Sequence, residues 1–247
     1  MPVSLEGKTA VVTCASSGIG AATAQMLAAE GVKVAGGARR VERLETELAY
    51  PLDVTDPDSC RAFVDAAVDA LGGIDILVNN AGLALGRDPV WEATDDDDRI
   101  VIETNVLGLM RMTRLCLPHI RDGGHMVNLG SIAGIWSYKN AASYVAAKAA
   151  VHAYTRALRD DLQGKPIRIT NVAPGLVGET EFSNVRFKGD DEKAAAVYEN
   201  VALGGALNAE DVAECILFAL TRRAPANIDE IVLMALAQTS GGNILRE

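Results

Sequence analysis

Short apolar segments recur along this chain, and longer segments with apolar residues at helical spacing lie between them. The apolar runs predict strands over residues 8–13, 32–36, 49–54, 74–79, 125–130, 167–173 and 228–235. The helical pattern predicts helices over residues 18–30, 40–48, 58–71, 96–117, 141–163, 190–200 and 209–221. Strands that alternate with helices form right-handed βαβ units, which place helices on both faces of one parallel sheet. The expected fold class is therefore α/β, with a doubly wound parallel sheet of about seven strands.

No linker, repeat or low-complexity stretch interrupts this alternation, so residues 1–247 are expected to form a single domain. With 49% hydrophobic residues, a chain of 247 residues can bury a full core. The segment between Arg40 and Asp53 is short, so the helix within it is expected to be stubby. Pro118 should end the long helix 96–117 or follow its last turn, because proline does not continue a helix.

The net charge of −10 argues against nucleic acid and against an anionic membrane as partners. Four cysteines are scattered without metal-ligand spacing, which favours free thiols in a reducing cytosol: Cys14, Cys60, Cys116 and Cys215. No signal peptide is visible, and no run of ~18 apolar residues would span a bilayer. A soluble, cytoplasmic protein is therefore expected.

Four consecutive carboxylates, Asp95 to Asp98, raise the question of a metal site. Side chains that are neighbours on a helix cannot all face one ion, and no histidine or further acidic pattern completes a ligand set. Thr94 or Asp95 as the helix N-cap, with the other charges facing the positive helix end, explains the run better. No metal site is therefore expected.

The first strand, the turn after it and the following helix form a pattern typical of phosphate binding. The turn runs from Cys14 to Gly20, and the predicted helix 18–30 follows it. Backbone N–H groups of such a turn, together with the positive end of the helix, face a pyrophosphate. A plain tight turn explains two glycines equally well, so this pattern depends on support from other motifs.

Tyr144 and Lys148 lie four residues apart in the predicted helix 141–163, so the phenol and the ammonium share one face. A phenol loses its proton near pH ~10, and a neighbouring cation lowers that pKa towards neutrality. Ser131 follows the strand 125–130 and is positioned to hydrogen-bond a carbonyl oxygen. These residues together predict an acid/base centre, although a Tyr–Lys pair alone is usually an ordinary surface pair.

Two further strands end in polar turns, Asn79-Asn80-Ala81-Gly82 and Asn171-Val172-Ala173-Pro174-Gly175, and Asn105 lies in the long helix between them. With the 13–20 turn and the Ser-Tyr-Lys set, these motifs resemble, in order, those of the short-chain dehydrogenase/reductase family. The resemblance covers essentially the whole chain. It implies a Rossmann fold, oxidoreductase activity on a small-molecule substrate and a homo-oligomer, either a tetramer or a dimer.

The resemblance also implies roles for individual residues. Tyr144 would be the acid/base, Ser131 would hold the substrate oxygen and Lys148 would bond the nicotinamide ribose. Asn105 would anchor a water that passes the proton to solvent. The cofactor contacts that the resemblance implies are Thr13, Ser16, Ser17, Gly18, Ile19, Gly20, Arg39, Arg40, Asp53, Val54, Asn80, Ala81, Gly82, Tyr144, Lys148, Pro174, Gly175 and Val177.

Cys14 departs from the family, which has its first cradle glycine at this position. That glycine makes the tight turn, and a Cβ would crowd either the loop or the pyrophosphate. The favoured interpretation is tolerance, because a small thiol fits if the local φ stays negative. The alternatives are a weakened cofactor affinity and a thiol that is oxidised beside the cofactor.

The second strand ends in Ala38-Arg39-Arg40, where an NAD-selective site would place a carboxylate. An arginine instead suits the 2′-phosphate of NADP, through charge-assisted and potentially bidentate hydrogen bonds. The alternative is that both arginines only flank a solvated helix start, although cations there oppose the helix dipole. NADP is therefore expected, with NAD less favoured.

In this family the segment after Pro174-Gly175, about residues 176–205, forms a lid over the nicotinamide and the substrate. Here it resembles, together with Gly82 to Gly86, the branch that oxidises 3-hydroxy acids and serine or allo-threonine. Such substrates carry a carboxylate two bonds from the reacting carbon, which Arg186 or Lys188 on the lid would bind. Ordinary solvation of these two loop cations is the alternative.

Three functions compete on these grounds. The leading one is an NADP-dependent 3-hydroxy acid dehydrogenase, acting on serine, allo-threonine or 3-hydroxypropanoate and also as a semialdehyde reductase. The second is a broader ketone or aldehyde reductase of the same family, which a substrate panel without carboxylates would reveal. The third is a dinucleotide-binding sensor without turnover, which the presence of Tyr144 and Lys148 disfavours.

Overall fold

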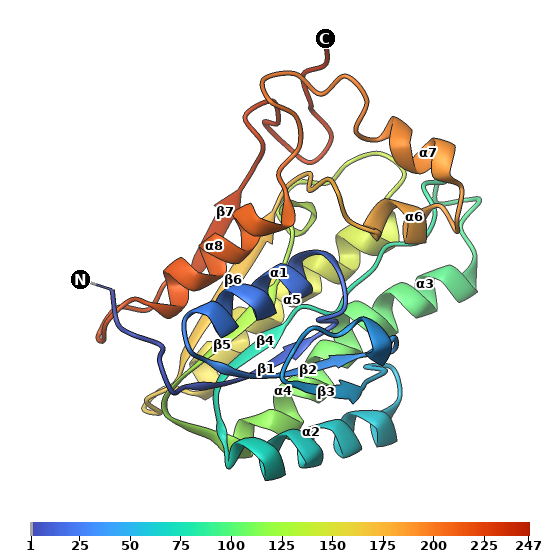
Figure 1. Cartoon of the computed structure of the whole chain (residues 1–247). Helices are drawn as coiled ribbons and strands as arrows, with labels where there is room; N and C mark the ends of the chain where they lie inside the picture. The colour runs from blue at the N-terminus through green and yellow to red at the C-terminus, as the bar shows by residue number, and fades with distance from the viewer. Residues whose placement is uncertain (1) are drawn as a thin grey trace.

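Seven parallel strands form one sheet at the centre of the structure, a computed structural model that describes residues 2–247 (Figure 1). The order across the sheet is β3-β2-β1-β4-β5-β6-β7. The strands are β1 Thr9–Thr13, β2 Lys33–Ala38, β3 Leu48–Pro51, β4 Ile74–Asn79, β5 Ile120–Leu129, β6 Arg168–Pro174 and β7 Glu230–Leu233. All neighbouring strands pair in parallel, which confirms the predicted α/β fold class.

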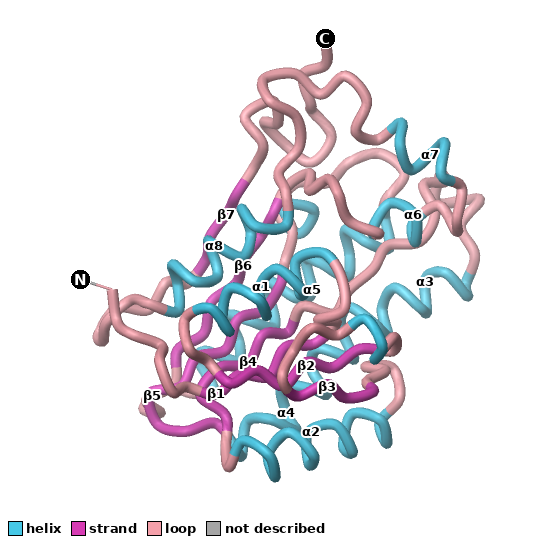
Figure 2. Tube along the Cα trace, in the orientation of Figure 1, coloured by secondary structure: helices cyan, strands magenta, loops and turns pink. Residues whose placement is uncertain are grey.

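Helices connect the strands and lie on both faces of the sheet (Figure 2). They are α1 Gly18–Ala29, α2 Pro57–Leu71, α3 Asp95–Ile102, α4 Leu109–Cys116, α5 Ala142–Asp161, α6 Phe182–Arg186, α7 Asp191–Ala196 and α8 Ala209–Leu220. On one face, α1 packs against α8 and both share an apolar core with the central strands. On the other face, α2, α4 and α5 contribute to a second apolar core.

Strand β1 shows how the sequence pattern produces these two cores. All five of its residues are buried. Successive side chains of a strand point to opposite faces, so Val12 packs with α1 and α8 while Val11 packs in the core of α2 and α4. A strand buried on both faces has an uninterrupted apolar run, which is the pattern that the sequence shows at this point.

Three of the predicted helices differ from the structure, one of them only in length: the helix predicted over 190–200 ends at Ala196. The helix predicted over 40–48 is wrong: this segment holds only the 3-10 turn Val41–Arg43, because β3 pairs with β2 from Leu48 onwards. The helix predicted over 96–117 is divided into α3 and α4 by a π-helical segment, Glu103–Gly108. Thr94 caps α3 by accepting a hydrogen bond from the Asp97 N–H (3.2 Å), which confirms the N-cap explanation of the acidic run.

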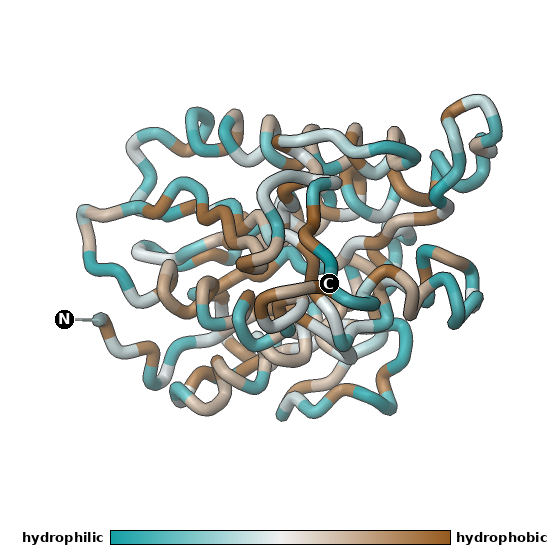
Figure 3. Tube along the Cα trace, turned by 90° about the horizontal axis from the view of Figure 1, so that it is seen from above, coloured by the Kyte–Doolittle hydropathy of each residue, from teal (hydrophilic) through white to brown (hydrophobic). Residues whose placement is uncertain are grey.

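The helices α6 and α7 and the end of the chain lie together beyond the carboxyl ends of β6 and β7 (Figure 1). Backbone hydrogen bonds join the tail to the segment after α7: the Ala202 N–H donates to the Leu245 carbonyl (3.1 Å) and the Glu247 N–H to the Asn200 carbonyl (2.9 Å). Seen from above, the C-terminus lies over the middle of the molecule (Figure 3). Among residues 2–247, no helix combines the length and apolar character needed to cross a bilayer.

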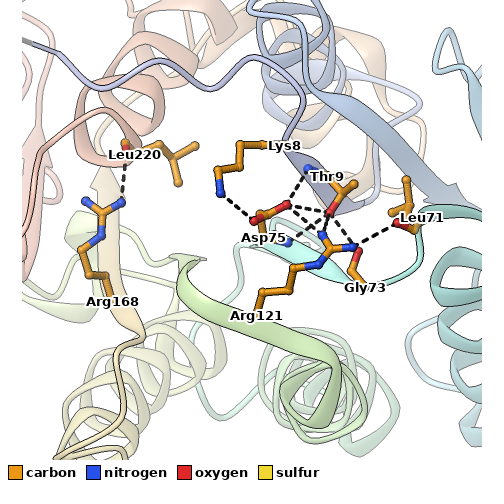
Figure 4. Close-up of polar contacts among 8 residues, drawn as sticks. All are labelled: Lys8, Thr9, Leu71, Gly73, Asp75, Arg121, Arg168 and Leu220. Atoms are coloured by element: carbon orange, nitrogen blue, oxygen red, sulfur yellow. Dashed lines mark hydrogen bonds and ion pairs between the residues drawn. The ribbon is translucent and has the colours of Figure 1, made fainter.

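At the opposite end of the strands, Asp75 ties the starts of β1, β4 and β5 together (Figure 4). Its carboxylate accepts hydrogen bonds from the Thr9 N–H (3.0 Å), the Lys8 ammonium (2.9 Å) and the Arg121 guanidinium (2.9 Å). Burial opposes ionisation of this carboxyl, but the hydrogen bonds from Lys8 and Thr9 outweigh burial and lower its pKa. Asp75 is therefore ionised and fully hydrogen-bonded at neutral pH.

Asp75→Ala is expected to lower the free energy of unfolding by about 1–3 kcal/mol, because the buried Thr9 N–H loses its acceptor. The folded-state pKa lies below the unfolded-state value of about 3.9, so ionisation of Asp75 stabilises the fold above that value. This contribution disappears as the pH falls through the folded-state pKa, and the deficit of the variant should shrink in acid. Urea denaturation at pH 7 and in acid measures both effects. Asp58→Ala, at a side chain that is 87% exposed, is the control, and an equal loss in the two variants would contradict the argument.

Candidate active site

A cavity of about 600 Å³ opens at the carboxyl edge of the sheet. Its walls come from the turns after β1, β2, β3, β4, β5 and β6, from the segment that contains α6, and from the C-terminal tail. The strand order reverses direction between β1 and β4, and doubly wound sheets bind ligands in the crevice at such a point. The cavity is therefore the candidate active site.

The turn between β1 and α1 brings the N-terminus of a helix to this cavity. Ser17, Gly18 and Ile19 line the cavity, and Gly18 has a left-handed φ of 52°. At Gly20 a Cβ would lie 2.2 Å from the Cys14 carbonyl oxygen, so only glycine fits. The first N–H groups of α1 have no partner within the helix, and an anion in the cavity would accept hydrogen bonds from them.

Three of the predicted cofactor residues do not line the cavity: Thr13, Ser16 and Gly20. The buried Thr13 hydroxyl accepts hydrogen bonds from the Asn80 N–H (3.0 Å) and the Ala81 N–H (2.9 Å). The Asn80 amide in turn donates to the Thr13 carbonyl (3.0 Å). These bonds join the ends of β1 and β4 and hold the floor of the cavity in place.

Cys14 has a φ of 55°, in the left-handed region. The favoured interpretation, in which φ stays negative, is therefore wrong. The turn imposes a left-handed backbone that suits glycine, and because Cys14 carries a Cβ, this conformation costs about 1–2 kcal/mol. Burial raises the pKa of the Cys14 thiol, although the positive charges of Arg39 and Arg40 oppose the shift. The thiol is thus protonated and a weak nucleophile at neutral pH.

The two arginines after β2 have different environments. Arg40 donates to the Glu181 carboxylate through both terminal nitrogens, and Arg43 donates to the same carboxylate (2.8 Å). Hydrogen bonding to Arg40 lowers the pKa of Glu181 to about 2. Arg39 is exposed and lines the cavity. Unlike Arg40, it forms no ion pair within residues 2–247. Arg39 is therefore free to bind an anion.

The remaining predicted cofactor residues surround the same cavity. Asp53 follows β3, and its carboxylate accepts hydrogen bonds from the Thr55 N–H (2.9 Å) and hydroxyl (2.7 Å). The other lining residues among those predicted are Val54, Asn80, Ala81, Gly82, Tyr144, Lys148, Pro174, Gly175 and Val177. Residues far apart in the sequence thus form one continuous wall.

Ser131 and Tyr144 both line the cavity and lie within hydrogen-bonding reach of each other. Ser131 caps a short 3-10 turn after β5, and its hydroxyl accepts a hydrogen bond from the Ala133 N–H (3.1 Å). Burial and the neighbouring Tyr138 raise the pKa of Tyr144, while a hydrogen bond with Ser131 and the charge of Arg186 act in the opposite direction. The Tyr144 phenol is therefore protonated at neutral pH and can donate its proton to an oxygen beside Ser131.

Lys148 lies one turn after Tyr144 on α5, as the spacing predicts, and it is only 5% exposed. Its ammonium donates to the Leu129 carbonyl (2.8 Å) and lies 5.9 Å from the centre of the Tyr144 ring. Burial lowers the pKa of Lys148 to about 8. The expectation that Lys148 lowers the pKa of Tyr144 is not met, because the ammonium is directed to a backbone carbonyl and burial of the phenol dominates.

Asn105 lies within the π-helical segment and is buried. Its amide donates to the Leu83 carbonyl (2.7 Å) and to the Val101 carbonyl (2.8 Å) and accepts from the Leu83 N–H (3.3 Å). These bonds fix the loop after β4 against the helix. The side chain does not line the cavity, and the water-anchoring role of Asn105 stays a prediction.

The two lid cations lie in different places. Arg186 is 8% exposed and lines the cavity, with its guanidinium carbon 5.6 Å from the centre of the Tyr144 ring. Its Nε donates to the Gly86 carbonyl (3.2 Å), and its buried Nη2 has no hydrogen-bond partner in the described chain. Lys188 lies outside the cavity and pairs with Asp97 (2.7 Å), so the structure does not bring it to the substrate region.

Several residues of the site carry no signal in the sequence. Phe182 packs edge-on against Tyr144, with ring centres 5.6 Å apart. The buried His152 connects Glu230 (Nδ1–Oε1 2.8 Å) to the Ser131 backbone carbonyl (Nε2–O 2.9 Å). Tail residues of the cavity wall include Gly241, Gly242, Ile244 and Arg246. For Phe182, the one available signal in the sequence is its position in the predicted lid segment 176–205.

A family model described as short chain dehydrogenase matches residues 8–191 of this chain. An NADP-dependent 3-hydroxy acid dehydrogenase of Escherichia coli (strain K12), YdfG, is 42% identical over 96% of this chain and 99% of its own. An NADP-dependent 3-hydroxy acid dehydrogenase of Schizosaccharomyces pombe is 43% identical over 98% of each chain.

The similar solved structures are also dehydrogenases. A closed form of serine dehydrogenase complexed with NADP+ is similar to this chain with a TM-score of 0.89 and 40% identity, over 97% of this chain and 100% of that one. A short chain dehydrogenase from Burkholderia cenocepacia in complex with NADP has a TM-score of 0.82 and 30% identity, over 97% and 99% of the two chains. The motifs that indicate the resemblance therefore lie in a fold that matches over the whole length.

Proposed function

This chain belongs to the short-chain dehydrogenase family, and on that premise we propose that it is an NADP-dependent oxidoreductase acting on short 3-hydroxy acids. It transfers a hydride between NADP(H) and the carbon that bears the 3-hydroxyl, or the semialdehyde carbonyl, of a substrate such as serine, allo-threonine or 3-hydroxypropanoate. The observation that carries the substrate class is the buried guanidinium of Arg186, which has a free nitrogen beside the Tyr144 ring.

The residues of the cavity fit a dinucleotide with a 2′-phosphate. Ser17, Gly18 and Ile19 present the start of α1 to a pyrophosphate, and Arg39 is available at the end of β2. Asp53 and Val54 line the wall after β3. The similar 3-hydroxy acid dehydrogenase of Escherichia coli is NADP-dependent, and the similar serine dehydrogenase structure is a complex with NADP+. When bound, the nicotinamide supplies the group that accepts or gives the hydride.

Tyr144 and Ser131 supply the proton chemistry. In reduction, the Tyr144 phenol donates its proton to the carbonyl oxygen while the carbonyl carbon receives the hydride. Its raised pKa keeps the phenol protonated for this step. The Ser131 hydroxyl hydrogen-bonds the same oxygen and stabilises the charge that develops on it. In oxidation both transfers run in reverse, and Tyr144 must first lose its proton to act as the base.

Arg186 positions the substrate for this chemistry. A 3-hydroxy acid that places its reacting oxygen between Ser131 and Tyr144 has its carboxylate two bonds from the reacting carbon. The Arg186 guanidinium lies beside the Tyr144 ring, and its Nη2, which has no hydrogen-bond partner in the described chain, is a donor for that carboxylate. Because the guanidinium is buried, the ion pair forms at a low local dielectric and is stronger than a surface pair.

Arg186→Ala should raise the KM for 3-hydroxypropanoate and serine by about tenfold or more, because a charge-assisted hydrogen bond to the carboxylate is lost. Neutral alcohols have no carboxylate and should change little. Steady-state oxidation with NADP, against a parallel series with NAD, measures both effects. Lys188→Ala is a matched control, since it removes a cation from the same loop but outside the cavity.

Two results would contradict this function. If Arg186→Ala raises the KM for acids and for neutral alcohols equally, Arg186 does not bind the carboxylate. The function is then that of a broader carbonyl reductase instead of a 3-hydroxy acid dehydrogenase. If the parent protein turns over neither acids nor simple ketones with either cofactor, the oxidoreductase activity itself is wrong.

A further inference from the structure

Two arginines from different segments face one aromatic ring at the substrate side of the cavity. The ring is Tyr138, which precedes α5. The guanidinium carbon of Arg186 lies 5.5 Å from its centre, and that of Arg87, in the loop after β4, lies 5.7 Å from it. Both arginines line the cavity, so two cations share one end of it.

These cations have no carboxylate partner. Among residues 2–247, no Asp or Glu forms an ion pair with Arg87 or Arg186, although acidic residues outnumber basic ones in the chain by 33 to 23. The surface cation Lys188, on the same lid as Arg186, does have such a partner in Asp97. Like charges held close together without a counter-charge destabilise a protein unless an anion binds between them.

A third arginine adds to the positive potential. Arg246, in the C-terminal tail, lines the same cavity and donates to the backbone carbonyls of Val197 and Glu199. Burial lowers the pKa of Arg87, and the positive charges of Arg186 and Arg246 lower it further. The carbonyl oxygens satisfy Arg246 without neutralising it, so the substrate end of the cavity keeps an excess of positive charge.

The two arginines on Tyr138 differ in depth. Arg186 is buried and lies beside the reactive Tyr144 ring. Arg87 is more exposed than Arg186 as a whole residue, although its guanidinium is partly buried where it lines the same cavity. A substrate held by Arg186 near the reacting carbon would therefore direct its far end towards Arg87.

We propose that the preferred substrate is a 3-hydroxy dicarboxylic acid, with its near carboxylate on Arg186 and its far carboxylate on Arg87. This inference rests on the proposed function and narrows its substrate class. The reaction is unchanged: the carbinol carbon gives a hydride to NADP+, its hydroxyl proton goes to Tyr144, and the products are a 3-oxo diacid and NADPH. Arg87 is then a specificity-determining residue that takes no part in the proton transfer.

The test compares 3-hydroxyglutarate with 3-hydroxypentanoate, which have the same chain length and differ only in a carboxylate against a methyl group at the far end. The parent enzyme should have a kcat/KM for 3-hydroxyglutarate at least about tenfold above that for either enantiomer of 3-hydroxypentanoate. Arg87→Met keeps the length of the side chain and removes its charge. It should lower kcat/KM for the diacid about tenfold, through KM, and leave 3-hydroxypentanoate within about twofold.

Arg99→Met is the matched control, because Arg99 pairs with Asp96 on α3 and does not line the cavity. It should leave the ratio of the two substrates unchanged, and Arg87→Lys should restore part of it. A parent enzyme that oxidises 3-hydroxypropanoate but does not prefer the diacid would overturn the inference and leave the proposed function intact. An equal loss of kcat/KM for both substrates in Arg87→Met would also overturn the inference, since Arg87 would then have only a structural role in its loop. A parent without activity on any 3-hydroxy acid would overturn the proposed function instead.

Discussion

Tyr144→Phe is expected to lower kcat at least ~10²-fold in both directions, because it removes the phenolic proton beside Ser131 while keeping the ring. The ring itself has structural contacts with Phe182 and with the Arg186 guanidinium, which phenylalanine preserves. The loss should therefore appear in kcat, with little change in NADP affinity. Stopped-flow and steady-state measurements at saturating cofactor provide the comparison.

Tyr138→Phe is a control within the same cavity. Tyr138 carries the two arginines on its ring face, and phenylalanine keeps that face while removing the hydroxyl. Its kcat should stay within a few-fold of the parent. A Tyr144→Phe enzyme that is as active as Tyr138→Phe would rule out Tyr144 as the acid/base.

Arg39→Asp is expected to weaken NADP binding by about ten- to a hundredfold and to shift the preference towards NAD. One charge-assisted contact with the 2′-phosphate is lost, worth roughly 1.5–3 kcal/mol, and the new carboxylate repels the phosphate. The structure separates Arg39 from its neighbour, because Glu181 already occupies the guanidinium of Arg40. Fluorescence titration of the protein with NADP and with NAD measures the two affinities.

Arg43→Gln is the control for this change. The Arg43 guanidinium is paired with Glu181 and does not line the cavity, so its loss should leave the affinity for NADP nearly unchanged. If Arg39→Asp and the parent bind NADP equally well, Arg39 points to solvent, and the 2′-phosphate is bound elsewhere.

The sheet and its cofactor-facing edge could be predicted from the sequence because the relevant interactions are local. Apolar runs such as that of β1 identify strands buried on both faces, and the order of strands and helices determines their parallel pairing. The four-residue spacing of Tyr144 and Lys148 places both side chains on one face of α5 without reference to any other element. The motifs that identify the family are short segments of this kind, each formed by residues close together in the sequence.

The local pattern was insufficient where a distant segment decides the conformation. In place of the helix expected over 40–48, the chain forms a 3-10 turn and an irregular segment, because it leads directly into β3, which pairs with β2 from Leu48 onwards. The π-helical segment coincides with the bonds of Asn105 to the Leu83 backbone, which lies 22 positions away. Cys14 takes a left-handed φ because the close approach at Gly20 and the bonds from Asn80 hold the turn in that shape.

The sequence by itself determined the fold class, the family, the phosphate-binding turn and the Ser-Tyr-Lys set, since each depends on periodicity or on residues a few positions apart. Tertiary structure alone decided which charges are free to act. It paired Arg40 with Glu181 and Lys188 with Asp97, and within residues 2–247 it left Arg39, Arg87 and Arg186 around one cavity without carboxylate partners. The physical reason is that ion pairing depends on distances between segments far apart in the chain, which the fold sets and the spacing of residues along the sequence does not.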